Sequence, residues 1–211
     1  MEGLNYTGTY VTEVKGTAPA VGYTALLSRY VEDRIDESLL TWAQQRIKKN
    51  QSMEAFLEEI LSVFHRNADG ELCIGSWMIR ECMKQTGSAF FNAKKNTKHP
   101  NKTLMPHLIG PIEPNLIPLM LKKKPIKDLQ KAGGYVHTVA MTTSQGGKRT
   151  SFFKAYESLP TGVTFTCTSY TDPEMMPEDL FKWWIVKTGS VGNYAWRDRF
   201  GKFTVKFNGK E

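Results

Sequence analysis

Cysteine is scarce in this chain, and the few that occur form no recognisable framework. The 211 residues include three cysteines, Cys73, Cys82 and Cys167, and no CxxC pair. An odd number of scattered cysteines is atypical of a disulfide framework and of a structural zinc site. We therefore expect three buried free thiols in a reducing compartment, and no metal site.

Long apolar runs are equally missing. No stretch approaches the roughly 20 apolar residues that a helix needs to cross a bilayer. The opening residues, MEGLNYTGTYVTEV, have neither the basic start nor the apolar centre of a signal peptide. The sequence thus predicts a soluble protein of the cytoplasm, or of the host cytoplasm if the protein is viral, with no membrane partner.

Motifs of common enzymes are also absent. There is no GxSxG, no Walker loop and no HExxH. None of the four histidines has the helical i, i+4 spacing of a metal site; they are His65, His99, His107 and His137. We expect a non-enzymatic protein with no catalytic residue and no cofactor. The alternative left open is a metal-independent endoribonuclease with His99 or His137 as its base.

Positive charge, in contrast, is abundant and unevenly placed. The chain carries a net charge of +7, yet the segment Phe91–Lys154 alone carries +10, from twelve basic and two acidic residues. The rest of the chain therefore sums to −3. Clustered cations favour a polyanion-binding protein, because contact with phosphates releases condensed counterions. The alternative is a solvated lysine-rich face that serves solubility.

Hydrophobic periodicity predicts a mixture of strands and helices. Alternating residues predict strands at Tyr6–Val14, Leu72–Ile74, Leu116–Leu121, Tyr135–Thr142, Thr150–Tyr156, Gly162–Tyr170 and Lys202–Phe207. Helical spacing predicts helices at Asp36–Lys48, from Asn50 through Phe64, at Ser76–Thr86 and at Glu178–Lys187. The order of these elements indicates an α+β fold, with an antiparallel sheet and helices packed on one face.

Glycine, proline and asparagine mark the connections. They predict a loop at Lys15–Gly22, a turn at Asn67–Gly70, a helix C′ residue at Gly87, an edge strand at Pro118, a hairpin turn at Ser144–Gly147 and a helix N1 residue at Pro177. The length favours a single domain over residues 1–211. The aperiodic stretch at about residues 91–104 is predicted to be a mobile basic loop.

The segment Thr188–Lys206 is the most specific candidate site. Its sequence, TGSVGNYAWRDRFGKFTVK, places glycines, aromatics and arginines between a helix and a strand. Glycine lets a backbone approach a phosphate, aromatic rings stack on bases, and cations attract the phosphates. The predicted nucleic-acid-binding residues here are Gly189, Gly192, Tyr194, Trp196, Arg197, Arg199 and Lys202. The alternative is a tight helix–strand connection in which Trp196 closes the core.

The remaining candidates come from the basic segment. In the strand Thr150–Tyr156, the side chains of Phe152, Lys154 and Tyr156 fall on one face, which suits a stacking platform on a sheet. The alternative is an aromatic strand of the core. Basic residues of the predicted loop and of the hairpin complete the site: Lys94, Lys95, Lys98, Lys102, Lys148 and Arg149.

These motifs resemble those of the RAMP superfamily, the ferredoxin-like or RRM-like proteins that bind RNA in CRISPR effector complexes. The resemblance covers about half the chain: an N-terminal strand, the unit from Asp69-Gly70 through Gly75-Ser76 with its following helix, and Gly189–Phe203. The pattern is also similar to small proteins carried in bacteriophage genomes. The family implies nucleic-acid binding along the sheet face and the glycine-rich loop. No second RAMP-like half and no obvious catalytic histidine are present, so RNA cleavage is not carried over.

Two classes of function follow from these observations. The first is non-enzymatic binding of single-stranded nucleic acid, with RNA favoured over DNA, through the basic surface and the glycine-rich loop. The second is a phage-encoded interaction protein that inhibits a host defence complex, with the predicted loop at Phe91–Thr103 ordering on a protein partner.

Overall fold

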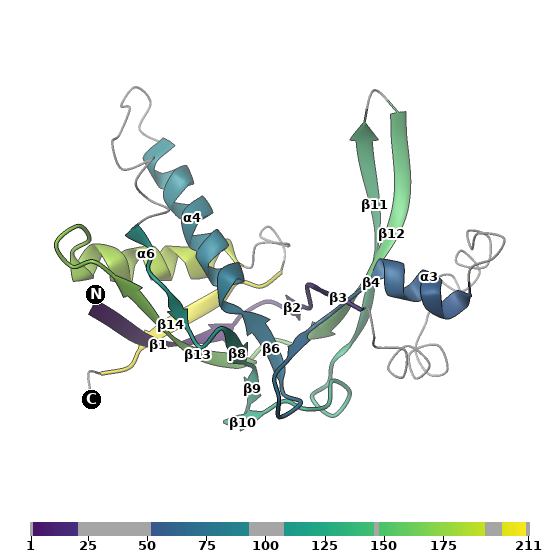
Figure 1. The fold of residues 1–211 in the computed structure, drawn as a ribbon, viewed down its shortest axis with the longest axis horizontal. Helices are drawn as coiled ribbons and strands as arrows, with labels where there is room; N and C mark the ends of the chain where they lie inside the picture. Colours follow the sequence, from purple (N-terminus) through teal and green to yellow (C-terminus); the bar gives the residue numbers. More distant parts are fainter. Residues whose placement is uncertain (1, 21–51, 93–107, 146–147, 193–199, 210–211) are drawn as a thin grey trace. The chain divides into compact units, whose positions relative to one another are not determined.

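A computed structural model describes residues 2–20, 52–92, 108–145, 148–192 and 200–209 (Figure 1). The predicted helix at Asp36–Lys48 and most of the predicted basic loop lie outside these ranges. The chain divides into two compact units; unit 1 comprises Met1–Val14, His65–Asp128 and Pro160–Glu211, and unit 2 comprises Lys15–Phe64 and Leu129–Leu159. Each unit is assembled from segments that are separate in the sequence. The single domain over residues 1–211 stays a prediction.

Unit 1 is built on an antiparallel sheet in the order β10-β9-β13-β1-β14, with β7 also paired to β13. Its strands are β1 (Glu2–Tyr10), β7 (Ile112–Glu113), β9 (Met120–Leu121), β10 (Lys124–Pro125), β13 (Thr164–Thr171) and β14 (Phe203–Phe207). The predicted strands at Gly162–Tyr170 and Lys202–Phe207 are confirmed within two residues, and the first predicted strand begins and ends four residues earlier.

Alternation along the longer strands of this sheet separates a buried face from an open one. In β13 every second residue is buried. Tyr10, Phe165 and Phe203 meet on the buried face, with ring centroids 5.0–5.8 Å apart. Because successive side chains of a strand point to opposite faces, the threonines between them fall on the other side.

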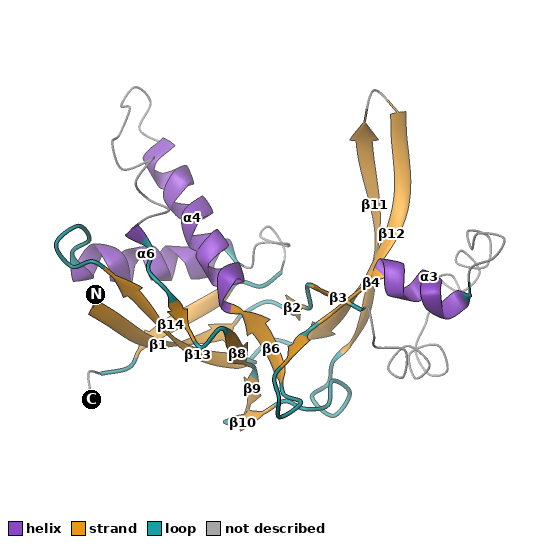
Figure 2. Ribbon diagram, in the orientation of Figure 1, coloured by secondary structure: helices purple, strands orange, loops and turns teal. Residues whose placement is uncertain are grey.

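Two helices cover the buried face of this sheet: α4 (Ser76–Asn92) and α6 (Glu178–Val191) lie on one side of it (Figure 2). They are joined to each other by the indole N–H of Trp184, which donates to the Met83 carbonyl at 2.8 Å. A shorter sheet of unit 1 comprises β5 (His65–Arg66), β6 (Leu72–Gly75) and β8 (Leu116–Pro118). Its edge strand β8 holds Pro118, as predicted, since an edge tolerates the missing donor.

The Asn67–Gly70 turn joins β5 to β6, which confirms that prediction. The Asn67 side-chain oxygen accepts from the backbone N–H groups of Asp69 and Glu71, and Gly70 takes a φ of +74°. An asparagine that bonds the backbone two residues ahead, followed by glycine at positive φ, is a strong local turn signal.

Unit 2 is built on the hairpin of β11 (Tyr135–Gln145) and β12 (Lys148–Leu159), which confirms the predicted hairpin. Strand β12 also pairs in parallel with β4 (Leu61–Val63), which in turn pairs with β3 (Ala18–Pro19). The unit is completed by α3 (Met53–Ile60) and by Lys15 of the two-residue strand β2 (Val14–Lys15), which pairs with β12.

A buried carboxylate ends helix α3 earlier than the sequence predicts. The helix stops at Ile60, so the prediction of a helix through Phe64 was wrong. Glu157 is fully buried, and its carboxylate accepts from the Phe64 backbone N–H at 2.7 Å. This charge-assisted bond and the pairing of β4 with β12 satisfy the backbone in an extended state. The predicted loop at Lys15–Gly22 was also wrong in part, because β2 and β3 lie there.

The other two helices are longer than predicted. Helix α4 continues through Gly87, which is buried inside it, since tertiary contacts outweigh the low helix propensity of glycine. Helix α6 runs to Val191, four residues past the predicted end, and Gly192 caps it at a φ of +90°. Pro177 takes ψ of 142°, so it is the N-cap residue and not N1.

The structure thus confirms the α+β class, with mostly antiparallel sheets and the one parallel pair noted in the described residues. The three cysteines are free and buried, as predicted. Among the described helices, none is long and apolar enough to cross a membrane.

Candidate nucleic-acid interface

The predicted binding residues fall into two groups. Eight lie outside the described residues: Lys94, Lys95, Lys98, Lys102, Tyr194, Trp196, Arg197 and Arg199. The others lie on described elements, with Lys148, Arg149, Phe152 and Lys154 on β12 of unit 2, Gly189 and Gly192 at the end of α6, and Lys202 just before β14. The backbone register places Arg149 opposite Ser144 and Phe152 opposite Met141.

The predicted stacking platform on β12 is partly buried. Lys154 and Tyr156 share a face, and the Lys154 ammonium lies 5.8 Å from the Tyr156 ring centroid. Tyr156 is only 5% exposed, and burial raises its pKa to about 12. A ring that solvent barely reaches is not available to stack on a base, so Tyr156 fits the core alternative.

Gly189 does not lie in a loop, and the prediction of a glycine-rich loop over residues 189–191 was wrong. The residue is inside α6 and buried against β14. A Cβ at this position would lie 2.2 Å from the Phe203 carbonyl oxygen. The glycine therefore allows a helix and a strand to approach closely, which is a packing requirement.

Gly192 is held by its backbone. Its N–H donates to the Thr188 carbonyl at 3.0 Å, and its own carbonyl accepts from the Cys82 thiol at 2.8 Å. Lys202 is held in the same way: its N–H donates to the Thr12 hydroxyl at 2.8 Å, and its carbonyl accepts from the Val11 N–H at 2.9 Å. Both ends of the segment Gly192–Lys202 are thus fixed to unit 1.

The open side of the main sheet carries hydrogen-bonding side chains that the sequence analysis did not assign to a site. This threonine face consists of Asn5, Thr7, Thr9, Thr164, Thr166, Thr168 and Thr204, all exposed or half-buried. Asn5 donates to the Thr168 hydroxyl at 2.9 Å, and the hydroxyls of Thr7 and Thr166 lie 3.0 Å apart. The alternation in TFTCTSYT was the signal that could have identified it.

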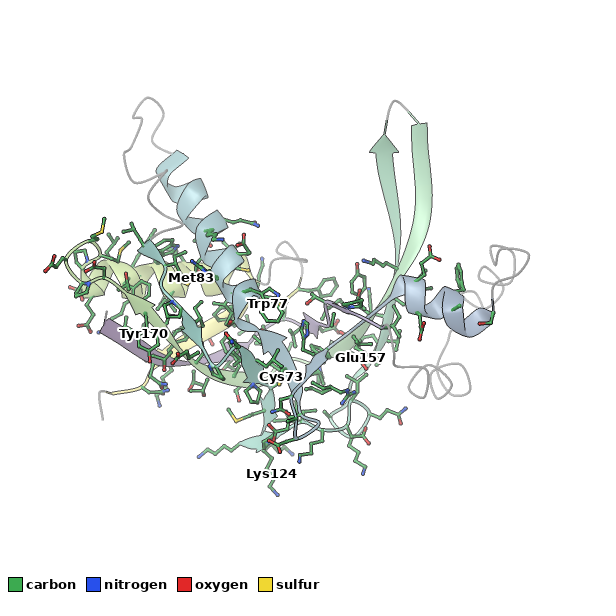
Figure 3. The ribbon with its side chains drawn as sticks, in the orientation of Figure 1. Cys73, Trp77, Met83, Lys124, Glu157 and Tyr170 are labelled. Atoms are coloured by element: carbon green, nitrogen blue, oxygen red, sulfur yellow. The ribbon has the colours of Figure 1, made fainter. Side chains whose placement is uncertain are left out.

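Tyr170 is the aromatic residue on this face of β1, β13 and β14. Its ring crosses Gly3 of the neighbouring strand, where an added Cβ would lie 2.6 Å from a ring carbon. Its hydroxyl donates to the Glu113 carboxylate at 3.3 Å, and that negative charge raises the pKa of Tyr170. Figure 3 places Tyr170 in unit 1, apart from the helices.

His65 is a second titratable group outside the predicted site. Its ring contacts Trp77 edge-on, with centroids 5.0 Å apart, and burial lowers its pKa from the ordinary 6.5. Of the other histidines, His137 lies half-buried in β11 and His99 lies outside the described residues, so the endoribonuclease alternative gains no support. Within the described ranges, no group of three or more potential metal ligands is present.

The lowered pKa of His65 predicts a pH dependence of stability. Near pH 6 the unfolded chain binds more protons at this residue than the folded chain, so the free energy of unfolding should fall as pH drops through about 6.5. The variant His65→Gln should show a smaller fall. Urea midpoints of both proteins between about pH 7.5 and 5.5 test this, and identical pH profiles would contradict it.

The chain matches no protein-family model, and a search of curated proteins finds no match.

Proposed function

We propose that this protein binds single-stranded nucleic acid, RNA in preference to DNA, as a non-enzymatic RAMP-like protein. The observation that carries the proposal is the concentration of positive charge, +10 in the segment Phe91–Lys154 of a chain whose net charge is +7. Such a segment gains free energy on contact with phosphates because condensed counterions are released. In this proposal the protein acts in the cytoplasm, or in the host cytoplasm if it is encoded by a phage.

The strand order of unit 1 supports a ferredoxin-like arrangement. The elements β1, α4, β9, β13, α6 and β14 follow one another along the chain in the order β-α-β-β-α-β, with further segments inserted between them. Strand β13 lies between β9 and β1, and β1 lies between β13 and β14. Each helix thus connects two strands that flank a third, which is the split β-α-β pattern of ferredoxin-like and RRM-like proteins.

The open face of the sheet supports binding dominated by the nucleic-acid backbone. RRM-like sheets read single strands by stacking bases on aromatic side chains of that face. Here the threonine face offers hydroxyl and amide groups, with Tyr170 as its aromatic residue on β1, β13 and β14. Hydroxyls and amides bond phosphate and sugar oxygens without reading sequence, so we expect weak sequence preference.

Binding of equal-length labelled single-stranded RNA, single-stranded DNA and duplex DNA tests the proposal. We expect the single strands to bind more tightly than the duplex. If five or six cations contact phosphates, affinity should fall with roughly the fourth power of salt concentration. The variant Arg197→Ala/Arg199→Ala should bind more weakly, whereas Lys182→Ala/Lys187→Ala on α6 removes equal charge outside the predicted site and should bind as the wild type does. Weak binding that is indifferent to strand type and to salt would contradict the proposal.

A protein partner is the second candidate, and the outer surface of α6 favours it. Leu180 and Val186 are 38% and 44% exposed, and Met175 before the helix is 54% exposed. Leu180, the half-buried Trp183 and Val186 follow one another at a spacing of three residues, which places neighbouring apolar groups on the helix surface. Exposed apolar groups gathered in this way are suited to a protein surface. Absence of nucleic-acid binding in the experiment above would favour this candidate.

A further inference from the structure

The hairpin between β9 and β10 is turned by two lysines. Leu121 pairs with Lys124, which leaves Lys122 and Lys123 as the two residues of the turn. Their φ angles are +50° and +65°. A two-residue hairpin with positive φ at both positions has the requirement of a type I′ turn, which asparagine and glycine meet best.

Lysine is an unfavourable choice for this conformation. A left-handed backbone brings Cβ close to the following carbonyl oxygen, which destabilises any residue with an ordinary side chain. Packing does not offset this strain, because Lys122 and Lys123 are both exposed. Backbone strain that the local fold does not require is a pointer to function.

The surrounding structure holds the hairpin in place. The Ile126 N–H donates to the Leu119 carbonyl at 2.9 Å, and the Ile126 carbonyl accepts from the Leu72 N–H at 2.7 Å. Ile126 and Leu119 are buried, and an Arg66 guanidinium N–H donates to the Lys127 carbonyl at 3.2 Å. The turn is therefore presented on a fixed base, so that binding does not have to order it first.

Within the residues that the structure describes, the amines around this turn have no acidic partner. We define the lysine tip as Lys122, Lys123, Lys124 and Lys127, all of which are exposed. The ion pairs of Lys84 with Glu81 and of Lys182 with Glu178 lie elsewhere in the described part of the chain, and neither involves the tip. Figure 3 shows the Lys124 side chain extending away from the ribbon. Four unpaired ammonium groups within six residues attract a polyanion more than a single small anion.

We propose that the lysine tip contacts the phosphate backbone of single-stranded nucleic acid, in addition to the residues of the predicted interface. This inference rests on the proposed function and extends its binding surface to β9 and β10. Lysine acts on phosphate as a flexible point charge, which fits a phosphodiester chain of variable path. The described residues of the tip form no enclosed site that would select a discrete ligand.

The variant Lys122→Asn/Lys123→Gly separates this role from a structural one. It installs the turn residues that the backbone conformation prefers, so its urea midpoint should equal or exceed that of the wild type. Its affinity for single-stranded RNA should fall about tenfold near physiological salt. The slope of the logarithm of the binding constant against the logarithm of the salt concentration should become shallower by roughly 1.4, which is about 0.7 for each lost phosphate contact. The variant Lys182→Ala/Lys187→Ala is the matched loss of two charges and should keep the wild-type slope.

The outcomes distinguish the tip from the proposed function. If Lys122→Asn/Lys123→Gly bound with wild-type affinity and an unchanged salt dependence, the proposed role of the lysine tip in binding would be contradicted. The proposed function of the protein would stay in place. An equal loss in both double variants would also contradict the role of the lysine tip, because net charge would then be the cause. Failure of the wild type to bind any single strand would overturn both.

Discussion

Replacing Phe165 by alanine is expected to lower the free energy of unfolding by about 3–5 kcal/mol. Phe165 is 0% exposed, and its ring packs against those of Tyr10 and Phe203. The ring also covers Gly8 on the neighbouring strand, where a Cβ would lie 2.3 Å from the ring carbons. Removing it would leave a cavity between β1, β13 and the helices, and the fixed strands cannot collapse to fill it.

Urea unfolding of Phe165→Ala and of the wild type measures this loss. Thr166→Ala is the control on the same strand, because Thr166 points to the open face and its hydroxyl contacts Thr7. We expect it to cost about 1 kcal/mol or less. Equal costs for the two variants would contradict the placement of the core on the Phe165 face.

Replacing Gly189 by alanine is expected to cost about 2–3 kcal/mol, although alanine favours a helix interior by about 1 kcal/mol over glycine. The added methyl would meet the Phe203 carbonyl oxygen, a backbone atom that cannot rotate away. Either α6 must move from β14 or the strand must shift, and both disturb the buried face of the sheet.

Gly209→Ala is the matched control, because an added Cβ there meets nothing within 4 Å. Its free energy of unfolding, measured by urea denaturation, should stay within about 0.5 kcal/mol of the wild-type value. The pair of variants also separates two roles for Gly189. A residue that served only to admit a phosphate would lose nucleic-acid binding on substitution with no change in stability, and that result would contradict the packing role.

Local patterns account for the parts of the fold that the sequence predicted. The turn at Asn67–Gly70 and the hairpin of β11 and β12 depend on neighbouring residues, and both are confirmed. Strand β13 was found because its alternation is strict. Long-range contacts decided the rest. The end of α3 depends on Glu157, which is 93 residues from Phe64, and the length of α6 depends on its fit to β14.

The residue types of the candidate site could be predicted from the sequence more readily than their arrangement in the fold. The basic segment and the cluster Gly189–Lys202 follow from the sequence directly. The helical state of Gly189 does not, because glycine and serine in succession normally indicate a loop. The lysine tip was visible as three consecutive lysines, but the positive φ angles that single it out are properties of the folded backbone.

The central position of β1 has a consequence for the growing polypeptide. Thr9 of β1 receives a hydrogen bond from Thr204 of β14, across 195 positions of sequence. A nascent chain must therefore expose one side of β1 until β14 leaves the ribosome, and closing so long a loop slows folding. Until then the unpaired strand is open to aggregation, so we expect synthesis of this protein to depend on chaperones more than a chain with local contacts would.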